Sequence, residues 1–340
     1  MSTAVLDTTL GRILEHVGPP DSFSPVEIVL HGGEPLLLGH AGVREVLTRI
    51  RRRLGAPTAV TIALQTNGVR LDQTFAELFV EFGVQVGVSL DGGPEATGRH
   101  RRFTNGRNSF PHVQRSLELL RNPRYRSTFA GLLCTVDVAN DPLTVLADLM
   151  AFAPPRIDFL LPHATWDHPP LRAAGEPSPY GDWLVAAFDH WYERPELAGV
   201  RLFEELIHAL LGGASLSEAV GLSAPASVVV ETDGTIEQTD ALKVSYDGAA
   251  VTGYDVALHS FDQVLADPAV AAASFANTLS AVCLSCPVVS GCGGGSTRTA
   301  IGRQRFREPL GVLPGPAELV SHVQRQLQID LRQQTEVSVP

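Results

Sequence analysis

The sequence predicts an α/β protein built on a parallel sheet that closes fully or partly into a barrel. Apolar, strand-like runs alternate regularly with helical patterns through the first half of the chain, an order that favours parallel strands joined by helices. The chain has 340 residues, of which 44% are apolar. That length is sufficient for one large barrel with an appendage, or for two domains.

Five strands and four helices are predicted in the first half. The strands are the apolar runs at 26–31, 59–65, 84–90, 127–136 and 156–161, and the helices lie near 41–54, 72–82, 109–121 and 141–152. Asp72 is placed to cap the second helix. Asp141 and Pro142 open the fourth with a cap and a proline at the first helical position. Residues 6–17 form a further helix before the first strand.

The pattern changes in the second half. Residues 162–182 are rich in Pro, His and Gly and are predicted to be a loop, followed by helices near 183–193 and 204–212. Two short strands at 227–231 and 235–238 flank Thr232-Asp233-Gly234, an arrangement typical of a β-hairpin. Residues 283–295 are rich in cysteine and glycine, and 316–333 form an amphipathic helix.

Composition excludes several functions. The net charge of −11 argues against a general nucleic-acid or anionic-membrane partner. No run of about eighteen apolar residues exists, and the N-terminus lacks the pattern of a secretion signal. Three of the four cysteines lie within ten residues of one another, which favours a metal or cluster site in a cytoplasmic protein over a disulfide framework.

Polar or turn residues follow most predicted strands. The first strand ends in His31-Gly32-Gly33-Glu34-Pro35, where the glycines let backbone approach a ligand and Glu34 can face a cationic group such as an α-amine. Because ligands bind at the carboxyl ends of parallel strands, we expect one rim that binds a polar, zwitterionic small molecule. Its residues are Glu34, Gln65, Asn67, Ser89, Asp91 and His163.

The cysteines Cys283, Cys286 and Cys292 have the spacing of a tight loop around one metal ion or one corner of a cluster. Three interpretations remain open. They are a partial iron–sulfur site, a zinc site completed by a residue such as His259 or Cys134, and reduced thiols without a metal.

Two further groups are candidates for substrate contact. His163 and Trp166 follow the fifth strand, at the open end of the predicted barrel, where a packed loop is an equally good reading. Glu237 and Asp240 lie near Lys243, the only lysine, on the predicted hairpin. They could exchange a proton at the barrel mouth, although a surface ion pair is the more ordinary interpretation. A serine hydrolase is excluded because no G-x-S-x-G elbow exists.

The motifs HGGEPLL, QTNG, VSLDG, GLLCTVD and FLLPHATW, in this order, resemble the radical S-adenosylmethionine enzymes with a C-terminal SPASM extension. The FxSxx-type maturases of ribosomal peptides are the most similar subgroup. The resemblance implies a partial (β/α)6 barrel missing its first strand, and a SPASM-like appendage that carries the three clustered cysteines. It assigns S-adenosylmethionine to a site lined by Gly32, Gly33, Glu34, Pro35, Asn67, Ser89, Asp91 and Leu161.

The same resemblance divides the chain into a barrel at 1–180, a helical connection at 181–226, a SPASM-like domain at 227–312 and a C-terminal helix at 313–340. The partner it implies is a ribosomal precursor peptide, with neither nucleic acid nor membrane.

The chain departs from the family in its cysteines, since none follows Cys292 where a SPASM extension normally brings more, and the defining motif is affected as well. The C-x-x-x-C-x-x-C motif that holds the [4Fe–4S] cluster is absent, since no cysteine precedes Cys134. We therefore expect either a radical S-adenosylmethionine peptide maturase that is inactive in radical chemistry as this chain, or a cluster-free scaffold that binds the peptide or S-adenosylmethionine.

Overall fold

The computed structural model describes residues 1–18, 25–55, 60–164, 178–194, 196–215, 217, 219–222, 227–268, 270, 279, 284–293 and 315–337. Six strands form one parallel sheet in sequence order. They are β1 (Val26–Leu30), β2 (Val60–Thr66), β3 (Val84–Ser89), β4 (Phe129–Thr135), β5 (Arg156–Leu160) and β6 (Gly199–Val200). This order and direction confirm the predicted α/β class with a parallel sheet.

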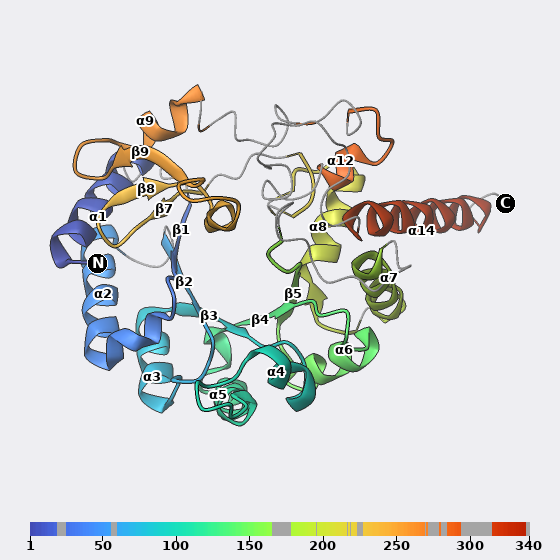
Figure 1. Cartoon of the computed structure of the whole chain (residues 1–340), viewed down its shortest axis with the longest axis horizontal. Helices are drawn as coiled ribbons and strands as arrows, with labels where there is room; N and C mark the ends of the chain where they lie inside the picture. The colour runs from blue at the N-terminus through green and yellow to red at the C-terminus, as the bar shows by residue number, and fades with distance from the viewer. Residues whose placement is uncertain are drawn as a thin grey trace.

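Helices cover the convex side of the sheet, which curves around an inner face (Figure 1). They are α1 (Thr3–Val17), α2 (Gly39–Leu54), α3 (Gln73–Phe82), α5 (Phe110–Arg121), α6 (Pro142–Met150), α7 (Pro179–Tyr192) and α8 (Arg201–Leu210). The short α4 (Pro94–His100) follows β3. The predicted caps are confirmed, because the side chains of Asp72 and Asp141 accept hydrogen bonds from the backbone N–H groups of Phe75 and Thr144.

Side-chain alternation fixes which face of each strand meets the helices. In β2, Val60, Ile62 and Leu64 are buried, and they pack with the apolar stripe of α2 in one core. Ala63 and Gln65 lie on the opposite face, toward the inside of the curved sheet. The inner face of the sheet is therefore the polar one, and polar side chains are available there for binding.

A second, antiparallel sheet consists of β7 (Val229–Val230), β8 (Thr235–Glu237) and β9 (Val251–Asp255). The predicted hairpin is thus confirmed in its central residues, and β9 adds a strand that the sequence pattern did not indicate. The sheet and α9 (Phe261–Ala266) pack a small apolar cluster against Val5 and Ile13 of α1. Figure 1 shows this sheet beside α1 and β1.

The C-terminal helix α14 (Gly315–Val337) packs along α7 and also contacts α8 and α12 (Val289–Cys292). Its buried residues Leu319, Val320 and Val323 belong to the main core. The predicted loop at 162–182 is wrong at its end, since α7 already begins at Pro179, where a proline suits the first turn. No helix in the described parts of the chain is both long enough and apolar enough to span a bilayer.

Candidate functional site

Three hydrogen bonds to the Glu34 carboxylate hold the turn after β1 in place. Glu34 Oε1 accepts hydrogen bonds from the Leu36 N–H at 3.0 Å and the Thr66 hydroxyl at 2.7 Å, and its Oε2 accepts one from the Asn67 N–H at 2.8 Å. The first bond caps the short 3-10 helix η2 (Pro35–Leu38). The other two join the ends of β1 and β2. Glu34 therefore fixes the shape of the turn, and this role is separate from any contact that it makes with a ligand.

The two glycines of this turn leave space above the backbone. Gly32 has φ +90°, a conformation that favours glycine, and a Cβ atom added at either Gly32 or Gly33 would meet nothing within 4 Å. Gly33 has no such backbone restriction, so a side chain there would only fill the open space. The turn thus presents exposed main chain at the carboxyl end of the sheet, as the sequence predicts for a ligand site.

The inner face beside this turn carries a cross-strand pair. The Gln65 side-chain amide donates a hydrogen bond to the Ser89 hydroxyl at 3.0 Å. A Cβ atom at Gly87 would come within 2.2 Å of Gln65 Oε1, so glycine at this position is what lets the amide lie flat on β3. Asn67 is exposed, and its Oδ1 accepts a bond from the Val69 N–H. The structure therefore brings two of the predicted rim residues, Gln65 and Ser89, together on β2 and β3, and places Asn67 directly after β2 against Glu34.

The contacts of Asp91 give it a structural role, and its place in the ligand site stays a prediction. Both of its carboxylate oxygens are bound by the Arg101 guanidinium, at 2.6 and 2.9 Å, and Oδ1 also accepts the Thr135 N–H at 3.1 Å. Only 7% of the side chain is exposed. Asp91 ties the loop after α4 to the end of β4, and a partner ten residues away cannot be recognised from a strand-end motif.

The remaining strand-end candidates lie after β5. Leu161 is half-buried against the main core, and His163 is exposed but has at least one interaction partner. Trp166 lies outside the described residues. Substrate contact by His163 and Trp166 stays a prediction.

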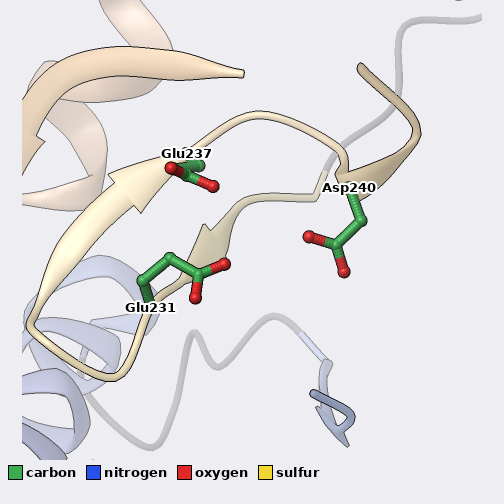
Figure 2. A group of neighbouring side chains, drawn as sticks. All are labelled: Glu231, Glu237 and Asp240. Atoms are coloured by element: carbon green, nitrogen blue, oxygen red, sulfur yellow. The ribbon is translucent and has the colours of Figure 1, made fainter. Parts of the chain in front are cut away.

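Figure 2 shows three neighbouring carboxylates, on Glu231, Glu237 and Asp240. The single lysine of the chain, Lys243, lies among them. Lys243 Nζ pairs with Glu231, with Glu237 Oε2 at 2.9 Å and with Asp240 Oδ1 at 3.0 Å. Partial burial lowers the pKa of Lys243, but the hydrogen bonds to the three carboxylates outweigh it and raise the pKa above its usual value. The other Asp240 oxygen, Oδ2, lies 3.9 Å from His31 Nδ1. The segment that follows the hairpin therefore lies next to the glycine turn.

The cysteines fall in two places. Cys134 is buried on β4, and burial, together with the nearby Asp91 charge, raises the pKa of its thiol well above the usual value. Cys286 and Cys292 are half-buried at α12 and pack on the main core. Cys283 lies outside the described residues. His259 contacts Asp255 and the Tyr254 ring, and zinc ligation by His259 or Cys134 stays a prediction.

One charged pair on the inner face was not predicted. Asp158 of β5 points away from the buried Ile157 and Phe159, and its Oδ2 accepts a hydrogen bond from Arg201 Nη1 at 3.1 Å. Burial raises the pKa of Asp158 to about 6, although Arg201 and Arg156 oppose the shift. The sequence feature that could have indicated this pair is a carboxylate in the middle of an apolar strand.

Residues 9–137, which include most of the curved parallel sheet and the glycine turn, match the Radical SAM superfamily. The chain contains this domain and is homologous to the anaerobic sulfatase-maturating enzymes. It is 27% identical, over 248 residues, to the cysteine-type enzyme of Clostridium perfringens, an alignment that covers 71% of this chain and 65% of the relative. It is also 35% identical, over 122 residues, to the serine-type enzyme of Klebsiella aerogenes, covering 35% of this chain and 29% of the relative. The chain thus spans somewhat less than two thirds of the Clostridium relative.

Solved structures share the fold. A structure described as native anSMEcpe with bound AdoMet has a TM-score of 0.82 at 20% identity, covering 97% of this chain and 89% of that one. Streptococcus suis SuiB bound to the precursor peptide SuiA has a TM-score of 0.57 at 12% identity, covering 92% and 69%. At these identities the similarity establishes the fold, and the ligands named belong to those proteins.

Proposed function

We propose that the chain binds S-adenosylmethionine at the His31–Pro35 turn and acts in the post-translational modification of a peptide. The observation that carries the proposal is the turn itself, where Glu34 is fixed by three hydrogen bonds while Gly32 and Gly33 remain uncovered. A preorganised turn of this kind can present backbone groups to an amino acid with little entropy cost of ordering the turn on binding. The relatives with bound AdoMet and bound peptides support the same ligand classes.

The residues at the turn fit S-adenosylmethionine better than they fit an iron–sulfur cluster. Such clusters are held by thiolates, whereas the described side chains around the turn supply carboxylate, hydroxyl and imidazole groups from Glu34, Thr66 and His31. Cys134 is kept as a neutral thiol by its burial. We therefore derive no radical step from these residues, and we expect these 340 residues alone to bind S-adenosylmethionine without forming 5′-deoxyadenosine.

The test is a thermal-shift titration with S-adenosylmethionine up to millimolar concentration. A ligand that binds the native state raises the melting temperature. Gly33→Val fills the open space without backbone strain, so it should abolish the shift and leave the unliganded melting temperature almost unchanged. Gly11→Val on α1 is the matched control and should keep the shift. Equal shifts in the wild type and in Gly33→Val would reject the site.

A second candidate is a cluster-free scaffold that binds the peptide or S-adenosylmethionine without chemistry. The described side chains at the turn favour this scaffold, because they supply carboxylate, hydroxyl and imidazole groups rather than the thiolates that hold a cluster. Anaerobic assays with dithionite test this candidate, because 5′-deoxyadenosine above background from this chain would exclude the scaffold and would also overturn the expectation that these residues alone form none.

A further inference from the structure

We propose that Lys243 is a positioning residue, the resident cation of a three-carboxylate cluster that directs Asp240 toward the ligand turn. The proposal rests on the proposed function in one respect, namely that the His31–Pro35 turn binds S-adenosylmethionine. It assigns a role to the only lysine in a chain that otherwise uses arginine for its permanent positive charges.

The first step is the geometry of the cluster. Glu231 follows β7, Glu237 ends β8, and Asp240 opens the 3-10 helix η4 (Asp240–Val244). Lys243 lies one turn after Asp240 on the same helix, so its ammonium reaches back to Asp240 and outward to both hairpin carboxylates. One cation therefore joins three separate segments.

The second step is charge. Carboxylate oxygens of the three residues lie within 4.8 Å of one another, a spacing at which like charges repel strongly. Glu237 is only 15% exposed, and its Oε2 is enclosed by protein. Without Lys243 the cluster would need protons, a metal ion or a rearrangement to relieve this repulsion. A lysine ammonium is a compact charge with three donors that can point in different directions, which suits three acceptors from different segments.

The third step links the cluster to the ligand turn. Asp240 uses Oδ1 for Lys243 and leaves Oδ2 toward His31. His31 directly precedes Gly32. Fixing one carboxylate oxygen of Asp240 thus fixes where the other lies relative to the turn. Loss of the Lys243 charge should therefore weaken the binding of a ligand at the turn.

The experiment uses the uniqueness of Lys243. Acetic anhydride, applied to the folded wild-type protein, neutralises this ammonium and the N-terminal amine, and mass spectrometry counts the products. Lys243→Arg treated in the same way loses only the N-terminal charge and is the matched control. Because the protein is already folded, this comparison does not depend on whether a Lys243→Met variant folds.

Two readouts follow, the Kd of S-adenosylmethionine by calorimetry and Mn²⁺ binding by electron paramagnetic resonance. For acetylated wild type and Lys243→Met we expect the Kd of S-adenosylmethionine to rise about three- to tenfold, a range typical of coupled neighbours. Acetylated Lys243→Arg should bind as the untreated protein does. Lys243→Met should also bind Mn²⁺ at least about tenfold more tightly than the wild type, since three carboxylates are then free for a hard cation.

A control for metal uptake is Arg44→Met, which breaks a two-residue pair with Glu81 on α2 and α3 and should gain no Mn²⁺ site. An unchanged Kd in the acetylated wild type would overturn the positioning role while the proposed function stands. If wild type and Lys243→Arg do not bind S-adenosylmethionine at all, the proposed function fails. Mn²⁺ uptake by Lys243→Met would then still support Lys243 as the resident cation, and its absence would overturn that role as well.

Discussion

His31 and Asp240 face each other across the junction between the barrel and the antiparallel sheet, with His31 Nδ1 lying 3.9 Å from Asp240 Oδ2. One residue begins the glycine turn after β1, and the other begins η4 after β8. Segments far apart in the sequence therefore meet at the carboxyl end of the parallel sheet, so a ligand at the turn would be bordered by both parts of the chain.

This contact should contribute little to stability. Both side chains are about half exposed, at 55% and 45%, and exposed ion pairs typically contribute less than about 1 kcal/mol. We expect His31→Gln to change the free energy of unfolding in urea by less than about 1 kcal/mol. A larger loss would mean that the pair holds the two parts together, a role that its exposure argues against.

The Asp91–Arg101 pair should behave differently, because Asp91 is buried. Removing one partner leaves an uncompensated charge, which typically costs about 3–5 kcal/mol in a buried setting. Arg101 is 27% exposed, so we expect Asp91→Ala to cost about 2–3 kcal/mol, somewhat less than in the fully buried case. A double-mutant cycle with Arg101→Ala measures the coupling. Additive losses would contradict the assignment of Asp91 as a clamp.

The hydrogen bond between Thr66 and Glu34 predicts that a substitution at Thr66 destabilises the protein. Thr66→Val keeps the shape of the buried side chain but removes the hydroxyl that donates to Glu34 Oε1. A hydrogen bond to a charged group contributes about 1.5–3 kcal/mol, and we expect a loss of that order in urea unfolding. Thr61→Val on the same strand is the control, since Thr61 is exposed and should tolerate the change.

Local signals explain what could be predicted from the sequence. The caps at Asp72 and Asp141 act on residues three positions away, and the strands show in their apolar runs. The glycine turn was recognised because its motif is contiguous. Lys243 stood out only as the single lysine, and its three partners could not all be identified before the hairpin and η4 were placed in space.

The contacts that were not predicted have a common cause, which is pairing between separate segments of the chain. The strand-end position of Asp91 is visible in the sequence, whereas its partner Arg101 could not be identified because the path of its segment is not. Asp158 was missed because its partner Arg201 starts a helix after β6, a strand of two residues too short for any periodic signal. Thr66 lies inside a recognised motif, but its role depends on Glu34 from the neighbouring strand.

The cysteines at α12 predict a limited metal content. After anaerobic reconstitution we expect at most one cluster or one zinc ion per chain, released by Cys286→Ser. Since binding energy in a small knot is also folding energy, that variant should also loosen the packing of α12. Cys134→Ala is the control and should retain the metal, because this thiol lies on β4. Elemental analysis that finds about eight irons per chain, as two [4Fe–4S] clusters would give, would contradict the prediction.

The last prediction concerns pH and Asp158. Its pKa of about 6 in the folded protein lies above the ordinary value of 3.8, chiefly because of burial. Well below pH 3.8 the carboxyl is protonated in both states and contributes no difference. As the pH rises toward 6 the unfolded chain releases this proton while the folded protein retains it, so stability falls, and above pH 6 the loss is complete.

A shift of about two pKa units corresponds to about 3 kcal/mol. Asp158→Asn does not titrate and keeps an oxygen for Arg201, so its free energy of unfolding relative to the wild type should rise between about pH 4 and 6 and then level off. Urea unfolding across this range measures the difference. Asp141→Asn is a control of opposite sign, because hydrogen bonds from Thr144 lower the pKa of Asp141. Its relative stability should fall as the pH rises through the acidic range. A flat profile for Asp158→Asn would show that Asp158 is as well solvated in the folded protein as in the unfolded chain.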